Sequence, residues 1–298
     1  MKRFLVTFLA AILAIAGVSR VYYALTDDFR LSNITSVVAH HPEWNLPPLA
    51  AVEEERLNAI LAQPYRYLGK GAQSYVFASA DGEYVLKFFK FKHLRPTPYL
   101  EWLPPFGPIA TYVEKVKQRK ERKLNGVFQS YLLAFHNDRE ESGLIFIQLN
   151  TEGNSSRKVS IEDKLGLHYE IPLEHYPFIL QKRGVPLDAT LDGLLKTGQL
   201  DAAKGKITQI FGLYAGEYRK GLFDHDHGVD RNTGFIGEQP IHLDVGKLLA
   251  DESMKDKNSA QRDARLVGEK MKEWVKKHYN HYDEEMSAHI DATIDRFF

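Results

Sequence analysis

The segment Gly221-Leu-Phe-Asp-His-Asp-His-Gly-Val-Asp-Arg-Asn-Thr-Gly-Phe-Ile-Gly-Glu-Gln-Pro-Ile-His-Leu-Asp-Val-Gly-Lys247 decides how the rest of the chain is interpreted. A polar loop ends at Asn232, and two short apolar runs follow it, separated by a Gly/Pro turn. This pattern predicts a small hairpin that brings Asn232 and Asp244 to the same end, beside Asp226. An amide and two carboxylates suit a hard divalent cation, with a spare carboxylate to accept a proton. The alternative interpretation is a solvated turn.

Composition limits the classes of protein that the chain can belong to. Its 298 residues are enough for one large domain or for two lobes around a cleft. The formal net charge is zero, so there is no global basic field and we expect no nucleic-acid partner. The chain has no cysteine, which excludes disulfides, thiolate metal sites and a cysteine nucleophile.

The first residues bear on where the protein is located. Lys2 and Arg3 precede an apolar run, and residues 4–25 contain only Arg20 as a charged side chain. This pattern predicts either a signal peptide, with Ala14-Ile15-Ala16 as its cleavage site, or a membrane anchor if the segment is uncleaved. A buried soluble helix is the third interpretation. We therefore expect a membrane-anchored or exported protein, on a side of the membrane that the sequence leaves open.

A second signal lies between Tyr67 and Phe89, where three predicted strands are joined by a glycine-containing turn and a tight Asp-Gly turn. Glycine at positions 69 and 71 lets backbone amides approach a phosphate without a side-chain clash. Lys87 stands in an apolar run, where a lysine is costly to bury unless it meets an anion. The alternative is an ordinary surface hairpin with an outward-pointing edge lysine.

In order and residue type, these segments resemble the protein kinase-like superfamily, in a compact and atypical form with degenerate motifs. Gly69 and Gly71 resemble the start of the kinase glycine-rich loop, with Ser74 in place of its third glycine. Lys87 resembles the kinase strand lysine that holds the α- and β-phosphates. A strand follows the glycines, whereas a dinucleotide-binding motif requires a helix there.

The same resemblance extends to the quoted segment. Asp226 and Asn232 resemble the catalytic loop, although they are six positions apart where kinases have five, and Asp224 replaces the kinase histidine. Asp244-Val245-Gly246 resembles the Asp-Phe-Gly segment. The resemblance implies that ATP and Mg²⁺ are cofactors, that Asn232 and Asp244 hold the metal and that Asp226 orients or deprotonates the acceptor hydroxyl.

A long charged helix is predicted over residues 111–135. In a kinase-like fold this helix supplies the glutamate that pairs with Lys87. Glu121 lies seven residues before Phe128 and is expected to share the inward stripe, while Glu114 is the alternative. By position alone, the strand ending at Gln181, Lys182 and Arg183 resembles the hinge whose backbone would contact the adenine of the nucleotide.

The expected fold class is α+β, a two-lobe protein kinase-like fold with an antiparallel sheet lobe and a helical lobe behind an N-terminal hydrophobic helix. The later part of the chain predicts helices over 187–195, 201–219, 260–279 and 282–298. The expected domains are 1–25 as signal peptide or anchor, 26–64 as connector, 65–185 as a β-rich N-lobe-like part with one long helix, and 186–298 as a helical C-lobe-like part.

The expected function is ATP/Mg-dependent transfer of the γ-phosphoryl group to a hydroxyl acceptor of unknown identity. The main alternative is a catalytically inactive kinase-like scaffold tethered to a membrane, and a third interpretation is an anchored structural module. Residues 94–108 form a proline-rich insert, interpreted as a lid, a partner-binding loop or a surface excursion. A zinc site made by His225, His227 and His242 is a further alternative, although no helical His pair or thiolate supports it.

Overall fold

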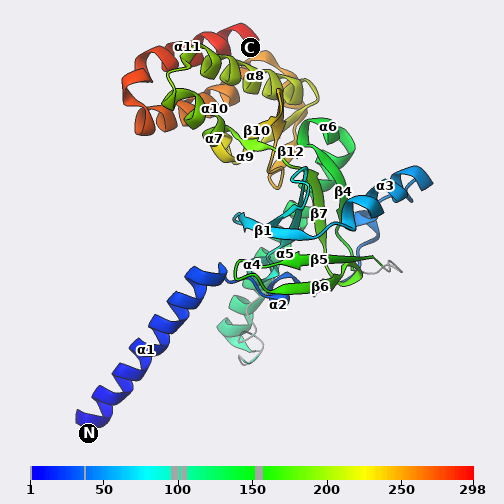
Figure 1. Ribbon diagram of the computed structural model, residues 1–298, viewed down its shortest axis with the longest axis vertical. Helices are drawn as coiled ribbons and strands as arrows, with labels where there is room; N and C mark the ends of the chain where they lie inside the picture. The colour runs from blue at the N-terminus through cyan, green and yellow to red at the C-terminus, as the bar shows by residue number, and fades with distance from the viewer. Residues whose placement is uncertain (1, 37, 95–99, 101, 103–105, 152–156) are drawn as a thin grey trace. The chain divides into compact units, whose positions relative to one another are not determined.

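The computed structural model describes residues 2–36, 38–94, 100, 102, 106–151 and 157–298. The chain forms two compact units: the first comprises Met1–Lys120 and Gln148–Leu180, and the second comprises Glu121–Ile147 and Gln181–Phe298. The first unit contains most of a β-sheet and the second is mainly helical (Figure 1). The mixed α+β class predicted from the sequence is therefore confirmed.

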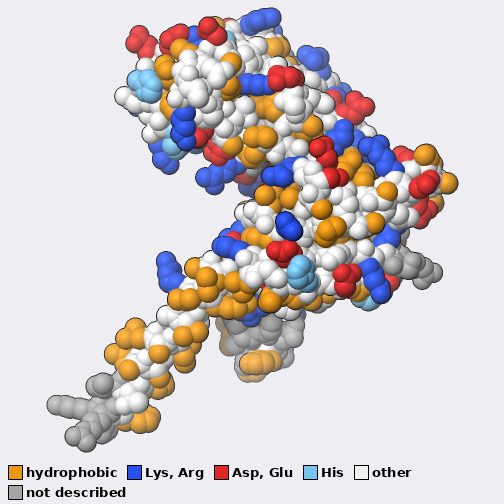
Figure 2. All heavy atoms as spheres, viewed as in Figure 1, with side chains coloured by type: hydrophobic (Ala, Val, Ile, Leu, Met, Phe, Trp, Pro, Cys, Tyr) orange, Lys and Arg blue, Asp and Glu red, His pale blue; other side chains and the backbone are white. Residues whose placement is uncertain are grey.

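The chain begins with the apolar helix α1 (Lys2–Thr26). Its segment Thr7–Thr26 has a mean hydropathy of 1.8 and none of its most apolar window is buried. Apolar side chains line the described part of this helix (Figure 2). The predicted N-terminal hydrophobic helix is confirmed. By length and composition it can cross a membrane, and an N-terminal signal sequence meets the same criteria.

The segment between α1 and the sheet belongs to the first unit. It contains α2 (Leu31–Ile34), the 3₁₀ turn η1 (Pro42–Trp44) and α3 (Ala51–Leu61). Ile34 and Trp44 are buried. The side-chain amide of Asn150 accepts the backbone N–H of His41 at 3.0 Å and donates to its carbonyl at 2.8 Å, which fixes the connector to a distant part of the same unit.

A seven-stranded sheet has the strand order β4-β7-β3-β2-β1-β5-β6. The neighbours β1 and β2, β2 and β3, and β5 and β6 pair antiparallel, whereas β1 and β5 pair parallel. The sheet is thus mixed, and the fully antiparallel sheet expected from the sequence is wrong for this pair. The strands are β1 (Tyr65–Lys70), β2 (Ser74–Ser79), β3 (Tyr84–Phe89), β4 (Leu144–Gln148), β5 (Lys158–Glu162), β6 (His168–Pro172) and β7 (Phe178–Lys182).

Aromatic side chains fill one face of the first three strands. The rings of Phe77 and Phe88 are fully buried and meet edge-on at 5.9 Å, while Phe29 from the connector packs on Phe77 at 5.2 Å. Such edge-to-face pairs add about 0.5–1.5 kcal/mol to the burial of their area. In β2 every second residue is buried, as expected for a strand with one face on the core.

The predicted long helix is α5 (Gly107–Asn137), flanked by the short helices α4 (Phe91–Leu94) and α6 (Arg139–Ser142). A short 3₁₀ turn, η3 (Leu173–His175), precedes β7. Of the proline-rich insert, residues 95–99, 101 and 103–105 lie outside the described residues. The expected lid or partner-binding role of the insert therefore stays a prediction.

Four helices of the second unit pack together, and each of these four was predicted. Their buried faces share one core that includes Phe211 of α8, Val267 and Met271 of α10 and Ile290 of α11. Gly268 permits close approach of α10 and α11, since a Cβ there would lie 2.7 Å from the Ile294 side chain. The helices are α7 (Leu187–Lys196), α8 (Leu200–Arg219), α10 (Lys257–His278) and α11 (Asp283–Phe297).

Short elements between α8 and α10 carry the polar loop quoted at the start. The predicted hairpin is β10 (Thr233–Ile236) with β11 (Gln239–His242), and β8 (Val185–Pro186) pairs with β10. Gly234 is required there, because a Cβ would lie 2.2 Å from the carbonyl oxygen of Val185. The remaining elements are β9 (Leu222–Asp224), α9 (Val229–Asn232), β12 (Leu248–Ala250), η4 (Glu252–Lys255) and η5 (Asn280–Tyr282).

Candidate functional site

The β10–β11 hairpin sets the geometry of the candidate site in the second unit. Asn232 directly precedes β10, and Leu243 and Asp244 directly follow β11. The carbonyl oxygen of Asn232 accepts the backbone N–H of Leu243 at 2.6 Å and that of Asp244 at 3.2 Å. The structure therefore places Asn232 and Asp244 at the same end of the hairpin.

The side chain of Asn232 joins this end of the hairpin to two carboxylates. Its Nδ2 lies 3.3 Å from Oδ2 of Asp224 and 3.5 Å from Oδ2 of Asp226. The backbone N–H of Asp226 in turn donates to Oδ1 of Asp224 at 3.0 Å, which closes the loop on itself. Asp226 and Asn232 therefore lie close together, because both donate hydrogen bonds to the carboxylate of Asp224.

Asp244 is held by one backbone and one side-chain donor. Its Oδ1 accepts the N–H of Gly246 at 3.1 Å and lies 3.4 Å from the hydroxyl of Tyr131. Burial and the neighbouring Asp244 carboxylate raise the pKa of Tyr131 well above its usual value, so its hydroxyl remains a donor. Within the described part of the chain, Oδ2 of Asp244 and Oδ1 of Asn232 have no hydrogen-bond partner.

These two open oxygens fit the requirements of a hard cation. Mg²⁺ prefers oxygen ligands and is usually bound by one or two carboxylates together with water and substrate phosphates. Asn232 Oδ1 and Asp244 Oδ2 are oxygens of that kind, and the hydrogen bonds made by the other atom of each group fix how they point. The type of oxygen at both positions is therefore the type that the ion implied by the sequence resemblance requires.

A buried ion triad lies behind the loop. His242 of β11, Glu217 of α8 and Asp224 of β9 are at most 1% exposed. Nδ1 of His242 is 2.7 Å from Oε1 of Glu217, and its Nε2 is 3.5 Å from Oδ2 of Asp224, a contact too long for a strong hydrogen bond. Burial acts to lower the pKa of His242, but the two carboxylates outweigh it and raise this pKa well above its usual value.

The triad also fixes the charge on Asp224. Burial acts to raise the pKa of Asp224, but His242 and the donors from Asp226 and Asn232 lower it below its usual value. Asp224 is therefore an ionised carboxylate in the interior, and it can accept hydrogen bonds from the loop at neutral pH. His242 acts on the loop through Asp224.

A second histidine fixes the other side of the loop. His227 has a left-handed backbone conformation, with φ of 50°. Its Nε2 is 2.7 Å from Oδ1 of Asp263 on α10, and the hydroxyl of Tyr218 donates to the other oxygen of that carboxylate at 2.7 Å. The bond to Asp263 raises the pKa of His227 above its usual value.

These contacts bear on the zinc alternative. His242 and His227 each pair with a carboxylate through a ring nitrogen. In the described part of the chain, no group of three or more His, Asp or Glu side chains is arranged to hold a metal ion. The zinc interpretation therefore has no structural support.

Lys247 adds a charge that sequence reasoning did not assign to the site. Its Nζ lies 2.7 Å from Oδ1 of Asp226, and both side chains are more than 40% exposed. Exposed pairs of this kind contribute only about 0–1 kcal/mol to stability. The position of Lys247, directly after Asp244-Val245-Gly246 and next to the candidate base, was the signal that could have identified it.

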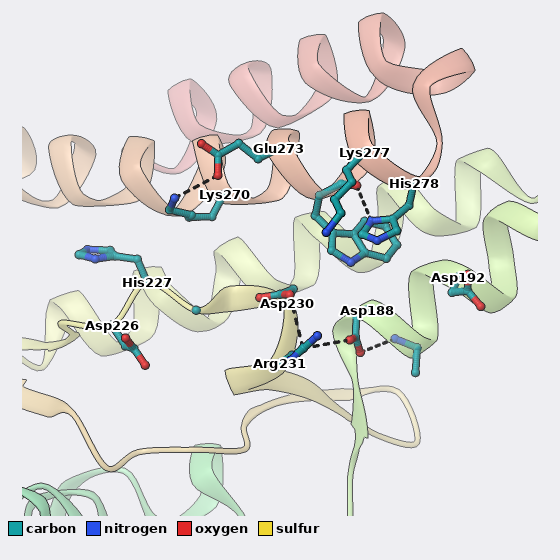
Figure 3. A pocket seen from close by; sticks show the side chains of 13 residues that line it. Asp188, Asp192, Asp226, His227, Asp230, Arg231, Lys270, Glu273, Lys277 and His278 are labelled. Carbon is teal, nitrogen blue, oxygen red and sulfur yellow. Dashed lines mark hydrogen bonds and ion pairs between the residues drawn. The ribbon is translucent and has the colours of Figure 1, made fainter. Parts of the chain in front are cut away.

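A pocket of about 540 Å³ opens beside the loop (Figure 3). Asp226 and His227 lie at one end, the first residues of α7 lie on the loop side, and the last half of α10 faces them across the pocket. The lining residues are Asp188, Ala189, Asp192, Asp226, His227, Gly228, Asp230, Arg231, Lys270, Glu273, Trp274, Lys277 and His278.

The glycine-containing hairpin lies in the first unit. Val76 pairs with Gly69 on one side and with Lys87 on the other, so these two residues share one row of the sheet. A Cβ at Gly69 would meet nothing within 4 Å, and the N–H of Gly71 donates to the carbonyl of Ser74 at 2.9 Å across the turn. A Cβ at Gly71 would lie 3.8 Å from Oγ of Ser74, an ordinary contact distance. Phosphate binding by these glycines stays a prediction.

Lys90 is a residue of this hairpin that sequence reasoning missed. It is 5% exposed, its Nζ donates to the carbonyl of Gly71, and the ammonium lies 4.7 Å from the centre of the Tyr75 ring. Burial, assisted by Lys70, lowers the pKa of Lys90 to about 8. The position of Lys90 among Phe88, Phe89 and Phe91 could have indicated that it is buried. Lys87, in contrast, is only half-buried.

Two of the predicted hinge residues, Gln181 and Lys182, end strand β7, and Arg183 follows it. Gln181 is buried, and its Nε2 donates to the carbonyls of Ser142 at 2.6 Å and Leu243 at 3.2 Å. The backbone N–H of Lys182 donates to the carbonyl of Gly143 at 2.8 Å. Lys182 and Arg183 are exposed. The backbone N–H of Lys182 is therefore already occupied, and Gln181 supports the segment before Asp244 through its side chain.

The two candidate glutamates of α5 are more exposed than the sequence led us to expect. Glu121 and Glu114 are both exposed, and the buried stripe of α5 begins only at Leu124. The expectation that Glu121 shares the inward stripe is therefore wrong, because the stripe begins about one turn after it. Glu114 accepts a hydrogen bond from Gln118 at 2.8 Å on the helix surface. The pairing of either glutamate with Lys87 stays a prediction.

No family model matches this sequence, and no curated protein matches it. Among solved structures, the chain is similar to the bifunctional kinase-methyltransferase WbdD, with a TM-score of 0.36 and 14% identity over 78% of this chain and 46% of that chain. It is also similar to Rv3197 of Mycobacterium tuberculosis, solved in complex with erythromycin, with a TM-score of 0.35 and 14% identity over 91% of this chain and 73% of that chain.

The chain spans less than half the length of the WbdD chain that it matches. TM-scores of this size establish neither a shared fold nor a shared activity. The function has to be argued from the residues of this chain.

Proposed function

We propose that this chain is a kinase-like phosphotransferase that uses ATP and Mg²⁺ and transfers the γ-phosphoryl group to a hydroxyl acceptor. The observation that carries the proposal is the meeting of Asp226, Asn232 and Asp244 at one end of the β10–β11 hairpin. An exposed carboxylate next to two oriented, open oxygens is the arrangement that phosphoryl transfer needs.

Each of the three residues has a separate role in this proposal. Asn232 Oδ1 and Asp244 Oδ2 would hold Mg²⁺, which supplies charge neutralisation at the phosphates when it is bound. Asp226 orients the acceptor hydroxyl and takes its proton. Lys247, paired with Asp226 at 2.7 Å, brings a positive charge to the place where negative charge develops.

The nucleotide contacts come from the first unit in this proposal. Gly69, Gly71 and Ser74 would cover the phosphates, and Lys87, positioned by Glu121, would hold the α- and β-phosphates. Gln181, Lys182 and Arg183 would lie at the adenine, with the contact made by backbone groups other than the Lys182 N–H, which already donates to Gly143. This assignment requires a two-lobe, kinase-like arrangement, which is part of the proposal. We also propose that residues 4–25 tether the domain to a membrane if they remain uncleaved.

The proposal is tested with the full-length chain in detergent. ATP with Mg²⁺ should raise its melting temperature, ATP with EDTA should raise it less, and ADP should be released in an acceptor-dependent way. Lys87→Ala should weaken nucleotide binding, since it removes the charge opposite the phosphates. The surface variant Lys158→Ala on β5 serves as the control. Unchanged affinity in Lys87→Ala would show that Lys87 does not touch nucleotide.

A second candidate is a catalytically inactive kinase-like module. Three observations favour it: the longer Asp226-to-Asn232 spacing, the serine at position 74 and the ion pair that occupies one oxygen of Asp226. Such a module would bind nucleotide without turning it over. Mg²⁺-dependent binding together with ADP release at the rate of a buffer blank would select this second candidate.

A further inference from the structure

The pocket beside Asp226 lies within the second unit, and the inference drawn from it rests on the proposed function. Figure 3 shows Lys270, Glu273, Lys277 and His278 of α10 on one side and Asp230, Arg231 and Asp188 on the other. Asp226 closes one end. A substrate in this pocket would therefore have one end next to the candidate base and its remainder between α7 and α10.

Two long cations of the pocket are not committed to close partners. Lys277 is exposed and has no hydrogen bond or ion pair among the described residues. The guanidinium of Arg231 is 82% exposed and lies 3.8 Å from Asp188 and 3.9 Å from Asp230, distances too long for hydrogen bonds. Both side chains are long and flexible, so both can close on an anionic group.

Some carboxylates of the pocket already accept hydrogen bonds, and others keep an oxygen with no close donor among the described residues. Asp192 already accepts from Tyr279 at 2.5 Å and from Lys196 at 2.5 Å. Among the described residues, the one polar side-chain contact of Asp230 is its long contact with Arg231. Asp226 keeps Oδ2, whose neighbour is Asn232 at 3.5 Å. The open carboxylate oxygens can accept hydrogen bonds from hydroxyl groups and cannot be matched by an apolar ligand.

The indole of Trp274 adds an apolar surface to this polar lining. It lines the pocket from α10, and its ring is 4.9 Å from that of His278 and 5.8 Å from that of Tyr279. These neighbours hold the indole in place. An aromatic face surrounded by open donors and acceptors suits a carbon skeleton that carries many hydroxyl groups.

We propose that this pocket binds the phosphoryl acceptor, and that the acceptor is a polyol bearing a phosphate group. Lys277 and Arg231 bind its phosphate, Asp230 accepts from its hydroxyls, and the hydroxyl to be modified lies next to Asp226. That hydroxyl oxygen attacks the γ-phosphorus of ATP, the bond from γ-phosphorus to the bridging oxygen breaks, ADP leaves, and the hydroxyl proton passes to Asp226. The products are ADP and a polyol with two phosphates.

The test measures binding of polyol phosphates to the full-length chain in detergent by calorimetry, without nucleotide. The probes are glycerol 3-phosphate, ribose 5-phosphate, glucose 6-phosphate and inositol 1-phosphate, each compared with its unphosphorylated parent. At least one phosphate should bind at least tenfold more tightly than its parent. Lys277→Gln should weaken that binding about tenfold or more, as expected for loss of a charge-assisted hydrogen bond.

Lys276→Gln is the matched control, because Lys276 is the exposed neighbour on α10 that does not line the pocket. Equal loss in both variants, or no preference for any phosphate over its parent, would overturn the proposed pocket. The same probes are then incubated with ATP and Mg²⁺. Binding without phosphoryl transfer would overturn the acceptor role. ADP release in the absence of any probe binding would keep the proposed function and remove only this inference.

Discussion

Nδ1 of His242 lies 2.7 Å from Oε1 of Glu217, and neither side chain has any exposed surface. This pair connects the core helix α8 to the strand that precedes Asp244, and Asp224 extends it to the loop that holds Asp226 and Asn232. The raised pKa of His242 makes the ring a cation between two buried carboxylates. The geometry of the candidate site therefore depends on a charge in the protein interior.

Substitution of His242 should be costly. His242→Gln leaves Glu217 buried without its cation, and breaking a buried pair in this way costs about 3–5 kcal/mol. Because the folded-state pKa of His242 is raised, its stabilisation is complete below its ordinary value of 6.5 and is lost as pH rises through the folded pKa. Urea unfolding of His242→Gln and of the exposed control His168→Gln measures the effect. A loss that does not shrink at alkaline pH would contradict this account.

Asp138 predicts a second pH dependence. Burial, then the charge of Glu217, raises the pKa of Asp138 to about 7, although Lys220 donates to it at 2.8 Å. A carboxyl group that keeps its proton in the folded state makes the protein less stable as pH rises from about 4 to about 7. Asp138→Asn should remove this decline, whereas the exposed control Asp201→Asn should keep it. Equal pH slopes in urea unfolding of both variants would refute the assignment.

The hairpin can be tested through its glycine. Gly234→Ala should destabilise the second unit strongly, because a Cβ would lie 2.2 Å from the backbone oxygen of Val185 and one of the two strands would have to move. Gly193→Ala on α7 is the matched control: its Cβ meets nothing within 4 Å, and alanine stabilises a helix interior by about 0.5–1 kcal/mol. We therefore expect Gly234→Ala to lower the melting temperature and Gly193→Ala to raise it.

Asp226 should matter for turnover and little for binding. Asp226→Asn removes the proton acceptor and keeps the shape of the side chain, so turnover should fall by about 10²–10⁴-fold. Nucleotide affinity should stay within a few-fold of wild type, and Asp201→Asn should leave both quantities unchanged. A steady-state assay of ADP release together with calorimetry provides both numbers. Turnover that survives in Asp226→Asn would remove its role as base.

The local chemistry of the chain was sufficient to predict the hairpin and the meeting of Asn232 with Asp244. A Gly/Pro turn between two short apolar runs fixes where its two ends meet, and this depends on about a dozen consecutive residues. The strands around Gly69 and the helices of the second unit were predicted for the same reason, because each is defined by its own period of apolar residues.

Contacts between residues far apart in the sequence could not be predicted in this way. His242 and Glu217 are 25 residues apart, and His227 and Asp263 are 36 apart, so no local pattern links them. The parallel pairing of β1 with β5 joins residues nearly a hundred positions apart. Lys87 was selected over Lys90 because Lys87 matches the kinase strand motif. The sequence does not show that Lys90 is the more deeply buried of the two lysines.

The most direct test of the central claim is calorimetric titration of ATP into the full-length chain, with and without Mg²⁺, for wild type, Asp244→Asn and the surface control Asp251→Asn. If Asn232 and Asp244 hold the ion, wild type and Asp251→Asn should bind ATP at least tenfold more tightly with Mg²⁺ than without it, and Asp244→Asn should lose this difference. Equal affinity with and without Mg²⁺ in the wild-type protein would contradict the account.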